Sequence, residues 1–377
     1  MPKFRAAQIL EWVYQKGVVD PGAMSNLSKL DRDTLARDMT FLSGDVLRHS
    51  AATDGTHKLL VQWRDYAQAD APAVPAPTDP VGPISLPVLG GDAGDPSRQT
   101  ECVMIPSAGA PRGERSESDV DEEDPGPGLP RFTACVSSQV GCPVGCRFCA
   151  SGLTGLDHNL SAGRIVEQVW RLGRLEGVRR ITNVVFMGMG EPLANLGAVV
   201  PAIRTLTSLW ATGISARKIT VSTVGLPKAI VKLAEQLDLP VTLALSLHAP
   251  TDELRRQLIP WAEYTTIADL LAACRTWFER TGREITLEYT LLRGVNDRPE
   301  HARALTDLAR TLRSNVNLIR YNEVAGLPFQ RPRDEDVREF QRLLRAAHIN
   351  AHIRASRGRD IAAACGQLRH ENAAKAG

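Results

Sequence analysis

The 377-residue sequence lacks any long apolar run. No stretch approaches the ~18 consecutive apolar residues that a membrane-spanning helix needs. The first 17 residues also lack the apolar core of a signal peptide, because their apolar residues have the spacing of an amphipathic helix. The sequence therefore predicts a soluble, cytoplasmic protein without membrane contact, long enough for two domains.

The sequence also lacks the even number of cysteines that is typical of a disulfide scaffold. It has seven cysteines. In a chain without a signal peptide, an odd number favours metal or redox chemistry in a reducing compartment.

The net charge is small, +2, but it is unevenly distributed. Seven acids and one arginine between Glu114 and Asp124 give this stretch a charge of −6, which leaves +8 on the rest of the chain. A basic body suits a polyanionic partner, because each neutralised phosphate releases counterions. The same pattern is also typical of Lys and Arg side chains that only solvate a surface.

Residues 1–66 are predicted to form a small helical unit. Apolar residues from Ala6 to Val13 have helical spacing, and Asp31 is expected to cap a second helix. A short strand is expected at 57–61.

Residues 67–130 are predicted to be a linker followed by an acidic insert at 107–128. Proline-rich and acidic stretches bury too little apolar surface to offset the entropy lost on ordering. An apolar segment at 101–106 interrupts them and is expected to form one strand.

From residue 131 onward, apolar segments alternate with helical ones. The expected strands are 132–136, 181–187, 219–222, 241–247, 285–290, 316–321 and 351–354. Nearly unbroken apolar strands that alternate with helices predict a parallel sheet. We therefore expect an α/β fold, a partial (β/α) TIM-type barrel over 131–356 with a small N-terminal helical domain. Catalytic residues should lie just past the carboxyl ends of the strands.

The strongest chemical signal is the loop Cys142-Pro-Val-Gly-Cys146-Arg-Phe-Cys149, directly after a strand. Thiolates at this spacing can surround one soft metal centre. A structural zinc normally has four ligands, often from two C-x2-C pairs, and no second pair occurs here. Three thiolates on a four-iron cluster would instead leave one iron open for a small molecule. Zinc with His158 as fourth ligand is the alternative.

A C-x3-C-x2-C loop with an aromatic residue before its last cysteine resembles the radical S-adenosylmethionine (radical SAM) superfamily. The string Cys135-Val-Ser-Ser-Gln-Val-Gly-Cys142 is similar to one branch, the RlmN/Cfr family of RNA adenine methyltransferases. Further matches follow in that family's order, at 186–192, 221–223, 245–250, 316–322 and 360–368. The resemblance is close over 131–368 and 101–106. It is looser over 4–66, which is similar to the family's helical RNA-binding domain.

The resemblance implies one [4Fe-4S] cluster on Cys142, Cys146 and Cys149, and S-adenosylmethionine (SAM) on residues at later strand ends. These are Gly190, Glu191, Ser222, Ser246, Leu247, His248 and Asn322. The residue types agree, since glycine lets a ligand approach the backbone closely and Glu191 could bind an ammonium group. The alternatives are a helix N-terminal acid for Glu191 and a structural histidine for His248.

A purine carbon is not a nucleophile, so it cannot displace a methyl group from a sulfonium directly. The resemblance implies that Cys365, in a flexible Gly/Ala-rich segment at 357–377, first takes a methyl group from SAM. A deoxyadenosyl radical from a second SAM abstracts hydrogen from that methyl group, and the carbon radical adds to the adenine ring. Cys135 then attacks Cys365 and leaves a disulfide, with Glu101 as proton acceptor. Without the resemblance, either cysteine reads as a buried small hydrophobe and Glu101 as an exposed acid.

The predicted function is methylation of carbon-2 of an adenosine in 23S rRNA and tRNA, by a monomer that uses two SAM per turnover. A flavodoxin- or ferredoxin-like protein is the expected electron donor. Arg320-Tyr321 before Asn322 resembles the branch that methylates carbon-8 (the Cfr type), whereas Pro192 resembles the carbon-2 branch.

Two other readings stay open. A non-catalytic RNA-binding protein with a zinc-like cysteine knuckle would leave Cys135, Cys365 and Glu191 without roles. A radical SAM enzyme acting on a small molecule would not need the N-terminal helical unit.

Overall fold

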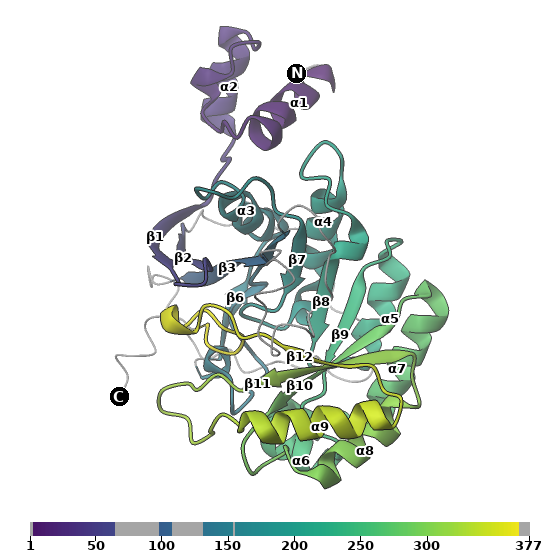
Figure 1. Cartoon of the computed structure of the whole chain (residues 1–377). Coiled ribbons are helices and arrows are strands. Elements are labelled where there is room, and N and C mark those ends of the chain that lie inside the picture. Colours follow the sequence, from purple (N-terminus) through teal and green to yellow (C-terminus); the bar gives the residue numbers. More distant parts are fainter. Residues whose placement is uncertain (1–2, 65–97, 108–130, 154, 369–377) are drawn as a thin grey trace, which may run out of the picture.

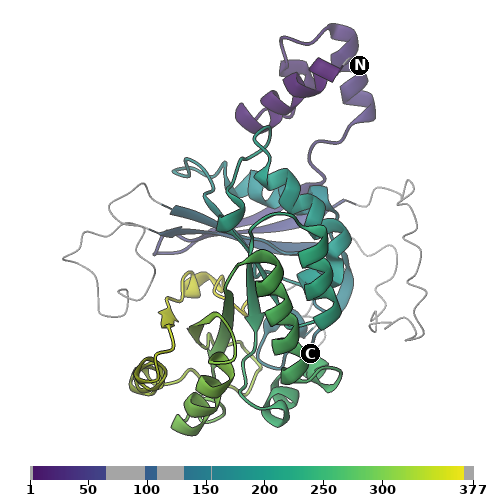
Figure 2. The same cartoon turned by 90° about the vertical axis from the view of Figure 1, so that its right-hand side faces the viewer.

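The computed structural model describes residues 3–64, 98–107, 131–153 and 155–368. The predicted linker and acidic insert lie outside these residues, apart from 98–107. The main feature is a curled ten-stranded sheet with helices on its outer face (Figures 1 and 2). The strand order is β1-β2-β3-β4-β7-β8-β9-β10-β11-β12. Because β1 and β12 end this order, the barrel is open, and the predicted partial barrel is confirmed.

Within this strand order, the seven strands from β4 to β12 pair in parallel. They are β4 (Arg131–Cys135), β7 (Asn183–Phe186), β8 (Ile219–Thr223), β9 (Thr242–Ser246), β10 (Ile285–Leu291), β11 (Ser314–Arg320) and β12 (Ala351–Arg354). Each corresponds to an expected strand. Their apolar side chains and those of the covering helices form one large core. Parallel pairing brings all carboxyl ends to one rim, where the predicted site residues lie.

The helices between these strands bury one apolar face each. They are α3 (Ala162–Leu172), α4 (Leu196–Thr207), α5 (Pro227–Gln236), α6 (Asp252–Leu258), α7 (Ile267–Thr281), α8 (Pro299–Ala309) and α9 (Asp334–Ala346). Ser161 caps α3, since its hydroxyl accepts the N–H of Arg164. Helix α4 contains Pro201 in its interior, a residue that normally interrupts helices.

Three antiparallel strands extend the sheet beyond β4. They are β1 (Gly44–Ala51), β2 (His57–Trp63) and β3 (Gln99–Ser107). The strand expected at 101–106 is present as β3, which pairs Val103 with Cys135 of β4. Residues 44–63, placed in the helical unit from the sequence, instead belong to this sheet, because β2 buries Leu59, Val61 and Trp63 in the main core.

The helical unit itself comprises α1 (Lys3–Leu10), a continuing π-helical turn and α2 (Lys29–Asp38). It has its own small core of Ile9, Met24, Leu27 and Leu35 and stands at one end of the molecule (Figures 1 and 2). Ser28, not Asp31, caps α2, because the Ser28 hydroxyl accepts the Asp31 N–H at 3.1 Å.

The helical unit touches the rest of the chain through a few specific contacts. The Trp170 indole N–H donates to the Val13 carbonyl at 2.8 Å, and the Tyr14 ring meets Trp210 edge-on at 5.8 Å. Arg174 stacks on Trp170 and also donates to Val13 at 2.9 Å. No helix in the described ranges combines the length and the apolar character that a bilayer crossing requires.

Candidate active site

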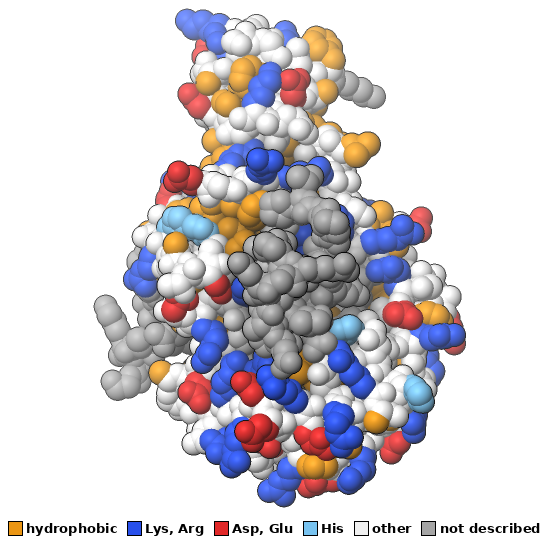
Figure 3. Space-filling view, in the orientation of Figure 1, with side chains coloured by type: hydrophobic (Ala, Val, Ile, Leu, Met, Phe, Trp, Pro, Cys, Tyr) orange, Lys and Arg blue, Asp and Glu red, His pale blue; other side chains and the backbone are white. Residues whose placement is uncertain are grey.

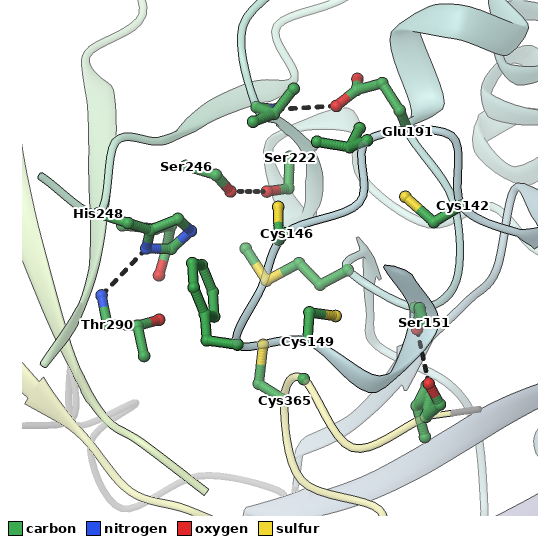
Figure 4. A pocket seen from close by; sticks show the side chains of 18 of the residues that line it. Cys142, Cys146, Cys149, Ser151, Glu191, Ser222, Ser246, His248, Thr290 and Cys365 are labelled. Carbon is green, nitrogen blue, oxygen red and sulfur yellow. Dashed lines mark hydrogen bonds between the residues drawn. The ribbon is translucent and has the colours of Figure 1, made fainter. Parts of the chain in front are cut away.

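Cys142, Cys146 and Cys149 lie on a loop that follows β4 and line one pocket (Figure 4). The loop begins at β5 (Gln139–Gly141), which pairs with β6 (Leu156–Asn159). The Cys142 N–H donates to the Gly155 carbonyl at 2.8 Å. Gly141 has a φ of +74°, and a Cβ there would lie 2.0 Å from that carbonyl oxygen, so only glycine allows this start of the loop.

Helix α6 holds the other side of the cysteine loop. The N–H of Arg147 donates to the Leu258 carbonyl at 3.0 Å. Val144 and Phe148, which alternate with the cysteines, pack with Leu258 in an apolar cluster of their own. Val144 and Phe148 also line the pocket, so the three thiols face it beside apolar side chains of the same loop.

The three thiols fit a cluster better than a single ion. Burial raises the pKa of Cys142 to about 12, so bound cations are needed to hold these groups as thiolates. Among the described residues, no three Cys, His, Asp or Glu side chains converge on one ion position. His158, the suggested fourth zinc ligand, lies on β6 beside Asp157 and 3.3 Å from Arg164, outside the pocket. The donor set suits an iron–sulfur cluster, in which each thiolate binds a different iron.

Gly190 and Glu191 lie past the end of β7 and line the same pocket. At Gly190, φ is +103° and a Cβ would come within 2.7 Å of the Gln139 side chain. The buried Glu191 carboxylate accepts N–H groups from Leu193 at 2.9 Å and Val224 at 2.8 Å. Burial raises its pKa to about 7. Glu191 therefore caps the following 3₁₀ turn, as the alternative reading expected, and also faces the pocket.

Ser222 and Ser246, at the ends of β8 and β9, face each other with their hydroxyl oxygens 3.2 Å apart (Figure 4). His248 has a φ of +56°, unusual for a non-glycine residue. Its Nδ1 accepts the Thr290 N–H at 3.0 Å, so the ring proton is on Nε2. Burial lowers the His248 pKa to about 3. His248 thus offers a neutral N–H donor to the pocket.

Of the two remaining predicted SAM-binding residues, Asn322 and Leu247, only the first lines the pocket. Asn322 lines the pocket, and its amide donates to the Cys365 carbonyl at 3.3 Å. Leu247 is fully buried and does not line the pocket; its carbonyl accepts a hydrogen bond from Arg255.

Cys365 lies beside Cys149 in this pocket, on a segment that is tied down (Figure 4). The Gly366 carbonyl accepts the N–H of Ala150 at 2.8 Å, and the Leu368 carbonyl accepts the Ser151 hydroxyl at 2.6 Å. The sequence analysis expected flexibility here from the Gly/Ala content. The described part of the segment is instead held against the cysteine loop through its own backbone carbonyls.

Cys365 also lines a second cavity, of about 760 Å³, together with Cys135. Burial raises the pKa of Cys135 to about 12, and the nearby Cys365 thiol adds to that shift. Cys365 itself is exposed where it lines the two cavities. All seven cysteines are free thiols, so the disulfide expected during turnover is not present. Basic side chains line the same cavity: Arg131, Arg217, Lys218, Arg283, Arg354 and Arg357.

Glu101 lies on β3 and lines neither cavity. It is buried, and its Oε1 is 2.7 Å from the ammonium of Lys58. Lys58 also donates to the Ala362 carbonyl at 3.1 Å. Glu101 is therefore not the exposed acid that the sequence alone suggests. It belongs to a buried ion pair, and Lys58 connects it to the segment that carries Cys365.

The sequence analysis missed three residues of the site. Glu288 and Thr290 on β10 line the pocket, and Arg255 on α6 is buried beside the cysteine loop. A charged residue in the otherwise apolar strand at 285–291 was an available signal for Glu288. Arg255 lies in the polar stretch at 251–257, and no pattern distinguishes it from the exposed residues around it.

Comparisons with known proteins give matches that together span nearly the whole chain. Residues 136–305 match the family model described as the radical SAM superfamily, and residues 1–40 match the ribosomal RNA large subunit methyltransferase N-terminal domain. The chain is 41% identical to a probable dual-specificity RNA methyltransferase RlmN of Gloeobacter violaceus, over 98% of this chain and 90% of that one. For the dual-specificity RNA methyltransferase RlmN of Marinobacter nauticus, identity is 39% over 97% and 86%.

A solved structure agrees over nearly the full length. The crystal structure of a radical SAM methyltransferase from Sphaerobacter thermophilus matches with a TM-score of 0.81 and 38% identity. The match covers 98% of this chain and 94% of that one. With near-full-length relatives at about 40% identity and both family models in the expected order, the chain belongs to the RlmN family of radical SAM methyltransferases.

Proposed function

We propose that this enzyme methylates carbon-2 of an adenosine in 23S rRNA, and also in tRNA, by way of a methylated Cys365. Its relatives are named dual-specificity RNA methyltransferases, and its first 40 residues match a domain of ribosomal RNA methyltransferases. The observation that carries the proposal is the place of Cys365, which lines both the pocket of the cysteine loop and the basic cavity that contains Cys135.

When bound, the [4Fe-4S] cluster and SAM used by the family supply a one-electron cleavage that generates a carbon radical, with two SAM consumed per turnover in our proposal. Cys142, Cys146 and Cys149 would hold the cluster. Glu191 would bind the SAM ammonium, because an adjacent cation stabilises its carboxylate form. The Nε2–H of His248 is a fixed donor for the nucleoside or carboxylate.

The two cysteines outside the loop determine what that radical chemistry accomplishes. Cys365 loses its thiol proton and accepts the methyl group, which places the methyl carbon where both cavities meet. Cys135, in the large cavity beside it, then attacks the Cys365 sulfur. A disulfide forms as the bond from sulfur to the transferred carbon breaks, and that carbon takes up a proton and leaves as the methyl group of the product. Glu101 is the proposed proton acceptor. Its ion pair with Lys58 has to open for this role, and Lys58 is the residue that joins it to the Cys365 segment.

The large cavity suits a nucleotide taken out of its stack. Enzymes that modify a base must extrude it into a pocket, and the basic rim can hold the phosphates on either side. On the described part of the face in view, Lys and Arg are interspersed with acids, so charge alone does not identify an RNA-binding surface there (Figure 3). The combination of basic rim and paired cysteines is what supports an RNA substrate here.

Arg320 and Tyr321 do not line the large cavity, although Ile319 and Asn322 on either side of them do. Tyr321 packs edge-on against Phe329 within the apolar cluster of the cysteine loop, and it lines the smaller pocket. Arg320 is paired with Asp334 at 3.1 Å. Because relatives that match nearly the whole chain are named RlmN, which resembles the carbon-2 branch, we assign carbon-2 and not carbon-8. We further propose a monomer that meets its RNA in the cytoplasm and receives electrons from a flavodoxin- or ferredoxin-like protein.

The RNA substrate can be tested through the N-terminal helical unit. We expect a variant lacking residues 2–40 to methylate RNA at least ~100-fold more slowly, because the phosphate contacts of a separate binding unit are lost. The deletion ends before Ser43 and Gly44, whose N–H groups bind Glu167 on α3 at 2.7 and 3.1 Å. Methylation of 23S rRNA fragments in vitro is the measurement.

The same variant provides its own control. SAM cleavage without RNA should stay within about threefold of wild type, because the deleted unit has a separate core and lines neither cavity. Undiminished RNA methylation by the deletion variant would contradict an RNA-binding role for this unit and favour a small-molecule substrate.

A further inference from the structure

Arg255, on α6, is a buried cation beside the cysteine loop that has no role in the proposed function. Its side chain is 0% exposed. Its Nε donates to the Leu247 carbonyl at 3.3 Å, and Nη2 donates to the Val224 carbonyl. These carbonyls follow β9 and β8, so Arg255 joins the carboxyl ends of two neighbouring strands under the cysteine loop.

The remaining nitrogen of Arg255, Nη1, is buried without a hydrogen-bond partner. A guanidinium presents five N–H donors in a rigid fork, and leaving a buried donor unpaired is costly. Burial lowers the Arg255 pKa to about 10, which leaves the group charged at neutral pH. An anionic or sulfur acceptor beside this buried cation would pair the free N–H donor and offset the cost of burying it.

Three titratable groups lie close enough to interact electrostatically with this guanidinium: Cys146, Asp252 and His248. The Asp252 carboxylate already accepts the Ile267 N–H at 2.8 Å. His248 is held neutral by burial and by Arg255 itself, which together bring its pKa to about 3. Cys146 is therefore the neighbour whose charge changes when iron binds, because a ligating thiol must become a thiolate.

The same helix fixes the spacing between Arg255 and the cysteine loop. The Leu258 carbonyl, three residues along α6, accepts the N–H of Arg147, which directly follows Cys146. Arg255 and the backbone next to Cys146 are thus held to one short helix. The guanidinium cannot move away from the thiolate without breaking this contact or the two strand-end hydrogen bonds.

We propose that Arg255 is a positioning residue for the [4Fe-4S] cluster, with Nη1–H donating to the Cys146 sulfur or to a cluster sulfide. A hydrogen bond to sulfur and a nearby positive charge both stabilise the reduced, more negative cluster, so Arg255 raises its reduction potential. The inference uses the cluster of the family and needs no RNA. It therefore stands or falls separately from the choice of RNA substrate.

A redox titration of the full-length, cluster-loaded enzyme, followed by electron paramagnetic resonance without SAM or RNA, tests the inference. We expect Arg255→Gln, which keeps N–H donors but removes the charge, to lower the equilibrium constant for one-electron reduction at least ~10-fold, or about 59 mV toward more negative potential. Arg255→Lys keeps the charge and should lie closer to wild type. Arg256→Gln is the matched control, because Arg256 is half-buried on the same helix and pairs only loosely with Glu253, at 3.8 Å; its potential should not change.

An Arg255→Gln enzyme with full iron and sulfide content and the wild-type potential would overturn the proposal and leave Arg255 as a brace between strands. If the Gln variant does not fold, an enzyme that keeps Arg255 decides the question. Labelled with ¹⁵N-arginine in an Arg147→Lys background, the reduced cluster should show coupling to a guanidinium nitrogen in pulsed resonance spectra. Absence of that coupling would contradict the hydrogen bond to sulfur.

Discussion

Cys135→Ala is expected to leave the enzyme covalently joined to its RNA. Cys135 and Cys365 line the same cavity, and Cys365 raises the pKa of Cys135 through their proximity. With the attacking sulfur removed, the bond between the Cys365 sulfur and the carbon now attached to the adenine has no release step. We expect multiple turnover to fall at least ~1000-fold, the scale on which loss of a covalent catalytic group acts. A denaturing gel with labelled RNA measures the adduct.

The matched control is Cys274→Ala. Cys274 is a fully buried thiol on α7 that lines neither cavity, so its replacement removes a sulfur from the core without touching the site. We expect normal turnover and no adduct from this variant. Free methylated RNA at wild-type yield from Cys135→Ala would remove the resolving role and leave Cys135 as a packing residue.

Cys365→Ala is expected to abolish RNA methylation while the cluster pocket stays intact. The thiol is the proposed carrier of the methyl group, and alanine cannot accept one, so methylation should drop below ~0.1% of wild type. The segment that carries Cys365 is held by the carbonyls of Gly366 and Leu368, so the substitution leaves its anchoring hydrogen bonds in place. Mass spectrometry of the purified protein should show a methylated peptide for wild type and none for the variant.

Comparing SAM cleavage with RNA methylation shows whether Cys365→Ala affects only the transfer of the methyl group. Cys365→Ala should still form 5′-deoxyadenosine from SAM without RNA, because Cys142, Cys146 and Cys149 are unchanged. Residual RNA methylation by Cys365→Ala would show that the methyl group reaches the base by another carrier. Loss of both activities would instead indicate that the substitution disturbs the cysteine loop, which the segment contacts through Ala150 and Ser151.

The sequence was most informative where the site is local. The three cysteines of the loop and the residues at strand ends follow directly from apolar strands and short motifs, because parallel pairing gathers strand ends on one rim. Leu247 shows the limit of this reasoning. Leu247 directly follows β9 and is buried, while Ser246 and His248 on either side of it line the pocket, and the motif alone does not distinguish the three.

What could not be predicted depends on contacts between distant segments. The pairing of Glu101 with Lys58 requires the antiparallel register of β2 and β3, which are separated by residues 64–98. Strand β1 buries only its first residue, so its sequence lacks the alternation that identifies a strand. The unpaired Nη1 of Arg255 can be recognised only from the structure, in which the carbonyls of Leu247 and Val224 accept hydrogen bonds from the other two guanidinium nitrogens.

The most direct test of the central claim is mass spectrometry of nucleosides from 23S rRNA of cells with and without the gene, repeated with the gene encoding Cys365→Ala. The account predicts 2-methyladenosine in cells with the wild-type gene, its loss without the gene, and no recovery with the Cys365→Ala form. A methyl group on carbon-8, or 2-methyladenosine that persists when Cys365 is replaced, would contradict it.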